Sequence, residues 1–172
     1  MIQVLDGADA FDAFASFQCP PMVVLQPWMA MVPQVTTTAE LSVLAYAVEA
    51  ARYELEAFEY YRYAVSWLSY GDTQAIGFAL DWFGPMAHSL QRASWHWQKA
   101  KEWLTKYGEA HKAALYHPLL TNAQAQDERM AQAAIQLCRY VERLCQQWHL
   151  AIPDWFDDPC PSDGNTEPGV NA

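Results

Sequence analysis

Acidic and histidine side chains are the residues in this sequence best suited to bind metal ions or to transfer protons. Helical proteins that hold two metal ions use Glu-x-x-His pairs that project inward from facing helices. No glutamate in the sequence is followed by a histidine three residues later. We therefore interpret the glutamates of the segment after Thr38 as a solvated acidic face and expect no metal site and no cofactor. They are Glu49, Glu54, Glu56 and Glu59.

The histidines and cysteines lack the spacings typical of zinc sites, because neither His-x-x-x-His nor Cys-x-x-Cys occurs. Cys138 and Cys145 lie seven residues apart in a helical pattern. That spacing separates them by about 10 Å along the helix axis, which is too far for a disulfide bond between them. Thiols that stay reduced are typical of the cytoplasm, so a cytoplasmic protein is predicted.

Signatures of nucleophilic catalysis and of phosphate binding are also absent. The sequence has no Gly-x-Ser-x-Gly motif and no glycine-rich phosphate loop, and it contains only seven glycines. These absences favour a binding protein over an enzyme. The alternative interpretation is a ligand-binding or enzymatic bundle with an aromatic pocket, lined by Trp67, Trp82, Trp97 and Trp103.

The first candidate binding surface is acidic. Glu49, Glu56 and Glu59 are predicted to share one side of a long helix, and Tyr63 follows them closely. An acidic side is common on soluble helices and usually serves solubility. With tyrosine beside it, the same side also suits the docking of a basic protein.

The second candidate binding surface combines an aromatic ring with positive charges. Arg92, Trp95 and Lys99 repeat at spacings of three and four, away from the apolar stripe that contains Leu90 and Trp97. Two interpretations remain open. Either Trp95 packs against a neighbouring helix within a solvated face, or the three side chains form an exposed patch for an acidic partner or for the acidic tail of the chain itself.

The net charge of −10 is concentrated at the two ends of the chain. Residues 1–84 carry ten acidic and two basic groups, and residues 151–172 carry five acidic groups and no basic group. Direct binding to nucleic acids or to anionic membranes rewards clustered Lys and Arg, so this distribution disfavours both. It also disfavours a DNA-binding helix-turn-helix within residues 73–107.

These features together predict a small cytoplasmic helical protein that acts by binding another macromolecule. Suitable roles are an inhibitor, an antitoxin or immunity-type protein, or an accessory subunit whose acidic face docks on a basic or nucleic-acid-handling protein. A homodimer through the long helix or the apolar N-terminal arm is a further alternative, because a projecting amphipathic helix leaves its apolar stripe uncovered.

The first long helix has the clearest signals. The sequence from Thr37 to Glu40 fits a capping box, in which a threonine hydroxyl and a glutamate carboxylate bond to each other's backbone N–H groups. The helix is predicted to continue to about Tyr70 and to stop at Gly71. Its buried apolar stripe is predicted to be Leu41, Leu44, Val48, Ala51, Leu55 and Phe58.

Two further long helices are predicted, each preceded by a short one. A short helix is expected from Asp72 to Gly84, after which Pro85 opens a long helix that ends near Tyr107. Another short helix is expected over residues 109–116, after which Asn122 caps the last long helix. The predicted stripes are Met86, Leu90, Ala93, Trp97, Ala100, Leu104 and Tyr107, and then Met130, Ala134, Leu137, Val141, Leu144 and Trp148.

The expected fold is therefore an all-α helical bundle over residues 38–156, with three long amphipathic helices and two or three short ones. Residues 1–37 are predicted to form a short helix at 8–17 and then, at 22–35, an extended apolar arm that is interrupted by prolines and packs on the bundle. Residues 157–172 are predicted to form a flexible acidic tail. No apolar stretch is long enough to span a bilayer.

Overall fold

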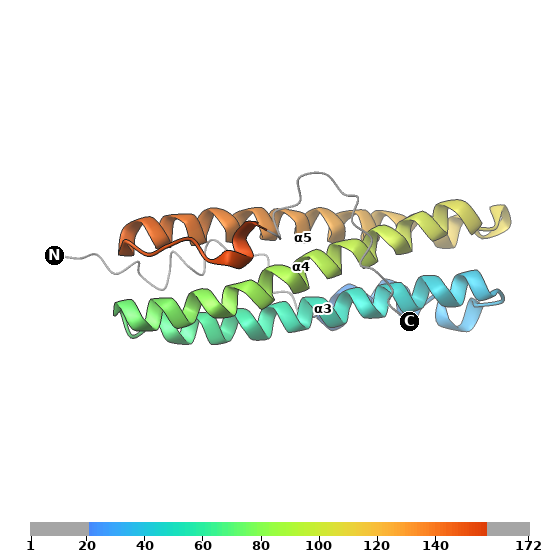
Figure 1. The fold of residues 1–172 in the computed structure, drawn as a ribbon. Coiled ribbons are helices and arrows are strands. Elements are labelled where there is room, and N and C mark those ends of the chain that lie inside the picture. Colours follow the sequence, from blue (N-terminus) through green and yellow to red (C-terminus); the bar gives the residue numbers. More distant parts are fainter. Residues whose placement is uncertain (1–20, 158–172) are drawn as a thin grey trace, which may run out of the picture.

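Three long helices that lie side by side make up most of the molecule (Figure 1). The computed structural model describes residues 21–157, and this part of the chain is all-α, as predicted. The predicted helix at 8–17 and residues 158–172 of the predicted tail lie outside the described residues. Within the described range, no helix is both long enough and apolar enough to cross a membrane. In chain order the elements are α2 (Pro21–Met29), the 3-10 helix η2 (Val32–Gln34), α3 (Thr38–Leu68), α4 (Thr73–Tyr107), η3 (Ala110–Lys112), α5 (Ala113–Trp148) and η4 (Asp154–Asp157).

The helices α3 and α4 form a long antiparallel hairpin, and α5 packs along α4 (Figure 1). The start of α3 is the predicted capping box. The Thr37 hydroxyl accepts a hydrogen bond from the Glu40 amide, and the Glu40 carboxylate accepts one from the Thr37 amide, each at 3.2 Å. The helix ends at Leu68, and Gly71 takes a φ of 66° in the turn into α4. Glycine adopts this left-handed conformation without strain.

The predicted core stripe of α3 is correct for only half of its members. Leu41, Val48 and Leu55 are exposed, whereas Ala51 is buried and Leu44 and Phe58 are half-buried against the core. The face that packs on the other helices consists mainly of small residues, also at spacings of three and four, namely Val43, Ala47, Ala50, Glu54, Ala57, Tyr61 and Ala64. Small side chains let two helices approach closely, so this face leaves room for the large residues of α4.

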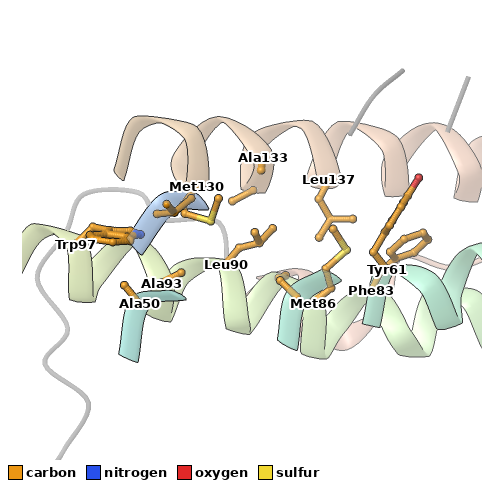
Figure 2. Close-up of a cluster of buried hydrophobic side chains, with 14 of the residues drawn as sticks. Ala50, Tyr61, Phe83, Met86, Leu90, Ala93, Trp97, Met130, Ala133 and Leu137 are labelled. Atoms are coloured by element: carbon orange, nitrogen blue, oxygen red, sulfur yellow. The ribbon is translucent and has the colours of Figure 1, made fainter. Parts of the chain in front are cut away.

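The core lies where α3, α4 and α5 meet (Figure 2). Large side chains of α4, among them Met86, Leu90 and Trp97, fill the space between the alanine-rich face of α3 and the apolar face of α5. The predicted stripes of α4 and α5 are buried there, except that Tyr107 is exposed and Trp148 is half-buried. Burial of these stripes against one another is the main apolar contribution to folding.

Two predicted helix boundaries are wrong, because α4 and α5 are each continuous across a proline. Pro85 lies inside α4 and Pro118 lies inside α5, and both are exposed. A proline in a helix removes one backbone hydrogen bond. At an exposed position, water can bind the carbonyl that loses its partner, which makes the loss of the hydrogen bond less costly. The packing of the turns on either side of the proline then outweighs that cost. Asn122 is therefore not a cap, and its side chain accepts a hydrogen bond from the Trp28 indole at 2.8 Å.

Gly84 allows a close contact and does not end a helix. It is buried within α4, and a Cβ atom placed on it would lie 2.9 Å from the Trp155 ring of η4. The Trp155 indole N–H donates to the carbonyl of Leu80 at 3.2 Å. Gly84 therefore provides the space in which η4 packs on α4.

The segment at 22–35 packs on the bundle, but it is mostly helical and not extended as predicted. Residues 21–29 form α2, with Pro27 inside it, and 32–34 form η2. The side chains of Val24, Trp28 and Met31 are buried against α3 and α5. Apolar residues at spacings of three and four explain this helix, because burial of one face outweighs the hydrogen bond that proline removes.

Candidate functional site

The two surfaces predicted from the sequence form one surface, because α3 and α4 pack side by side. Arg92 of α4 donates a hydrogen bond to the Tyr53 hydroxyl of α3 at 2.8 Å. Trp95 of α4 contacts Tyr46 of α3 with 6.0 Å between ring centroids. The Lys99 ammonium lies 5.5 Å from the centre of the Trp95 ring. We call this the seam surface, formed by Tyr46, Glu49, Arg52, Tyr53 and Glu56 of α3 and by Arg92, Trp95, His96 and Lys99 of α4.

A row of aromatic residues on α3 underlies the seam surface. Four aromatic residues lie seven residues apart, and each contacts an aromatic or histidine ring of α4. The ring centroids are 6.2 Å apart for Tyr46 with Trp103, 5.2 Å for Tyr53 with His96, 6.0 Å for Tyr60 with Trp82 and 4.9 Å for Trp67 with Phe78. The seven-residue repeat is a signal that the sequence analysis missed. It places the four rings on one side of α3.

The charges on the seam surface are largely paired within their own helices. Arg52 forms ion pairs with both Glu49 and Glu56, and Lys99 pairs with Glu102 at 3.0 Å. The acidic residues of α3 therefore do not form an uninterrupted negative patch. Exposed pairs of this kind contribute little to stability, so their side chains can exchange one partner for another at small cost.

Glu59 and Tyr63 lie farther along α3 than the other predicted binding residues. The Glu59 carboxylate is 4.0 Å from the Arg62 guanidinium, and the Tyr63 ring contacts Trp82 with 5.0 Å between centroids. Neither contact involves Trp95 or its cationic neighbours. The structure therefore brings together Glu49, Glu56, Arg92, Trp95 and Lys99, while Glu59 and Tyr63 are adjacent to that group but not part of it.

Trp95 is half-buried, and His96 beside it is held in a neutral form. Burial lowers the pKa of His96, although a hydrogen bond to the Arg92 carbonyl partly opposes this. The His96 Nδ1 atom lies 2.7 Å from that carbonyl oxygen, which can only accept, so Nδ1 carries the proton. The imidazole ring packs against Tyr46, Tyr53 and Trp95. Arginine and lysine thus provide the positive charge of this surface.

Glu54 was predicted to be solvated, but it is buried between the three long helices. Its carboxylate accepts a hydrogen bond from the Trp97 indole of α4 at 2.8 Å and forms an ion pair with Arg129 of α5. Burial raises the pKa of Glu54, and the charge of Arg129 opposes that rise. The position of Glu54 among Ala47, Ala50 and Ala57 on one helical face could have indicated its burial.

Glu40 is a second buried carboxylate. It accepts hydrogen bonds from the Lys112 ammonium at 2.6 Å, from the Tyr116 hydroxyl and from the Thr36 amide at 2.7 Å. Burial raises the pKa of Glu40, but these bonds together outweigh it and lower the pKa to about 2. The cap of α3 is thereby tied to the segment that leads into α5.

The low pKa of Glu40 predicts a specific loss of stability in acid. Because the folded pKa is about 2 and the ordinary value is 4.5, the contribution is complete above pH 4.5 and is lost as the pH falls toward 2. We expect wild type to lose about 2 kcal/mol more than Glu40→Gln over this interval, measured by urea unfolding at several pH values. Other carboxylates titrate in both proteins, so parallel stability curves would contradict this role of Glu40.

The described residues show no arrangement for metal or thiol chemistry. They contain no group of three or more His, Cys, Asp or Glu side chains that could hold a metal ion. Cys138 and Cys145 are buried thiols that are not joined in a disulfide, and burial raises the pKa of Cys145. A raised pKa keeps a thiol protonated and unreactive.

The four tryptophans considered for an aromatic pocket do not converge. Trp97 is buried beside Trp28, with 5.6 Å between ring centroids. Trp67, Trp82 and Trp103 are half-buried along the α3–α4 contact, each next to different aromatic partners. A shallow, open depression between α4 and α5 is lined by other residues, among them Lys101, Gln124 and Glu128, which hydrogen-bond to one another.

The chain matches no protein-family model, no curated protein and no solved structure.

Proposed function

We propose that this chain acts by binding another protein through the seam surface, as an inhibitor, an antitoxin or immunity-type protein, or an accessory subunit. The observation that carries the proposal is the half-buried Trp95 ring, which contacts the Tyr46 ring and has the Lys99 ammonium 5.5 Å from its centre. Trp, Tyr and Arg side chains contribute most of the binding energy in many protein interfaces. Two long packed helices hold these side chains on a rigid support, which lowers the entropy lost on binding.

The charge of the chain supports a basic partner, such as a protein that itself handles nucleic acids. The net charge of −10 would attract such a protein over long distances and raise its association rate. The carboxylates of Glu49 and Glu56 lie beside the aromatic rings, and their exposed pairs with Arg52 can be exchanged for pairs with a partner's Lys or Arg. In this proposal the aromatic rings provide most of the binding energy, and the acidic groups raise the association rate.

The test compares variants of the seam surface with a control on another helix. Partners captured from the native host are purified, and their affinities are measured for wild type, for Arg92→Ala/Trp95→Ala and for Ile135→Ala, which changes an exposed residue of α5. We expect the double variant to weaken binding at least about 100-fold and the control to bind like wild type. Thermal unfolding confirms that each variant is folded.

A second variant tests the acidic contribution. Glu49→Gln/Glu56→Gln/Glu59→Gln is expected to slow association and to reduce its dependence on salt, with a smaller change in the dissociation rate. If the Arg92→Ala/Trp95→Ala variant captures the same partners with unchanged affinity, the seam surface is not the binding site. If only the triple variant loses binding, the acidic residues bind the partner without the aromatic ones.

A further inference from the structure

The helix α3 exposes a row of apolar residues on the side opposite its buried face. We call it the outer row, and its members are Leu41, Val48, Leu55, Tyr63 and Tyr70, the last just beyond the helix end. Their exposed fractions are 60%, 52%, 46%, 49% and 70%. A step of seven residues falls about 20° short of two full turns, and the eight-residue step from Leu55 to Tyr63 exceeds two turns by about 80°. The members of the row within the helix therefore stay within about 80° of one another around α3.

We propose that the outer row is the contact surface of a homodimer in which two copies of α3 pack antiparallel. The positions of the row are almost symmetric about the midpoint between residues 55 and 56. In an antiparallel pair centred there, Leu41 of each copy lies opposite Tyr70 of the other, and Val48 lies opposite Tyr63. The two Leu55 side chains meet at the axis. A two-fold dimer needs such a self-complementary surface.

The charges between the apolar residues favour this orientation. Arg52 and Glu59 lie on the same side of α3 as the outer row and are equally far from the midpoint. In the antiparallel pair Arg52 of each copy therefore faces Glu59 of the other, which gives two opposite-charge contacts. A parallel pair would place Arg52 beside Arg52 and Glu59 beside Glu59, and like charges in such positions oppose association.

The dimer proposal rests on apolar residues that are not part of the seam surface, and the two surfaces share only Arg52. The outer row would otherwise leave large apolar side chains in water along most of α3, and exposed apolar rows of this kind mark contact surfaces. The seam variant Arg92→Ala/Trp95→Ala is expected to keep the dimer, and Leu55→Glu is expected to lose it. These two variants therefore distinguish failure of the dimer proposal from failure of the proposed binding through the seam surface.

The first test measures the mass of the full chain by sedimentation over a wide range of protein concentration. We expect wild type to show a monomer–dimer equilibrium. Leu55→Glu should raise the dissociation constant at least about tenfold, whereas Ile135→Glu, the matched change on α5, should leave it unchanged. A wild-type chain that is monomeric at every concentration, or a Leu55→Glu variant that dimerises like wild type, would overturn the proposal.

The second test concerns the antiparallel orientation. Arg52→Glu and Glu59→Arg should each weaken the dimer, and the double variant should recover it, because the reversed charges again face each other. Spin labels attached without cysteine chemistry at Thr38, an exposed residue of α3 outside the outer row, should lie about 50 Å apart in the antiparallel dimer and about 10 Å apart in a parallel one. The short distance, or a double variant weaker than both single ones, would rule out this arrangement.

Discussion

Replacement of Arg129 by methionine is expected to lower the free energy of unfolding by about 3–5 kcal/mol. Methionine keeps much of the apolar volume but leaves the Glu54 carboxylate without its ion-pair partner. Glu54 is 5% exposed, so water cannot hydrate its carboxylate in place of the lost guanidinium. The cost of an unpaired buried charge is therefore imposed on the folded state alone. Urea unfolding at neutral pH measures this difference.

Two further variants separate this charge effect from a loss of packing. Arg52→Met removes an arginine from an exposed pair and is expected to cost less than about 1 kcal/mol. Adding Glu54→Gln to Arg129→Met should recover much of the lost stability, because the neutral amide oxygen can still accept the Trp97 indole N–H. If the double variant is as unstable as Arg129→Met, the loss comes from packing and not from the unpaired carboxylate.

The same substitution at two leucines is expected to give very different results. Leu90→Ala should destabilise the protein by about 2–5 kcal/mol, because Leu90 is fully buried between the long helices and its removal leaves a cavity. Leu55→Ala should change stability by less than about 0.5 kcal/mol, because this side chain lies on the outer side of α3, is 46% exposed and leaves no enclosed cavity when it is shortened. Both leucines belong to predicted apolar stripes, but only Leu90 is in the core.

Thermal or urea unfolding of the two variants, at one low protein concentration that limits dimerisation, provides the comparison. Ala50→Leu is a useful complement, because Ala50 is fully buried on the face of α3 that packs in the core. A larger side chain there should cost about 1–3 kcal/mol through overpacking. A large loss for Leu55→Ala together with a tolerant Ala50 would mean that α3 is turned the other way in the bundle.

The seam surface could be predicted from the sequence only in part. Glu49 and Glu56 were predicted in one group and Arg92, Trp95 and Lys99 in another, because residues about forty positions apart give no local signal of contact. The hydrogen bond between Arg92 and Tyr53 joins these groups and exists only because α3 and α4 pack side by side. The aromatic repeat beginning at Tyr46 was visible in the sequence, but its partners on α4 were not.

Local patterns in the sequence were enough to predict that the chain forms long helices and where the first of them begins. The capping box at Thr37 and the stripes of α4 and α5 are local patterns, and one pattern of apolar residues dominates each of those two helices. A capping box or an apolar stripe depends on residues only a few positions apart, so it can be predicted without knowledge of the fold.

Local patterns could not predict which side of α3 is buried or whether helices continue across Pro85 and Pro118, because both depend on packing between helices. The side of α3 is set because the helix has two apolar stripes, and close packing on α4 favours the one rich in alanine over the one that contains Leu41, Val48 and Leu55. The helices continue across the prolines because the turns on both sides of each proline are packed on neighbouring helices. In both cases the energy of contacts between distant segments exceeds the local preference of the chain.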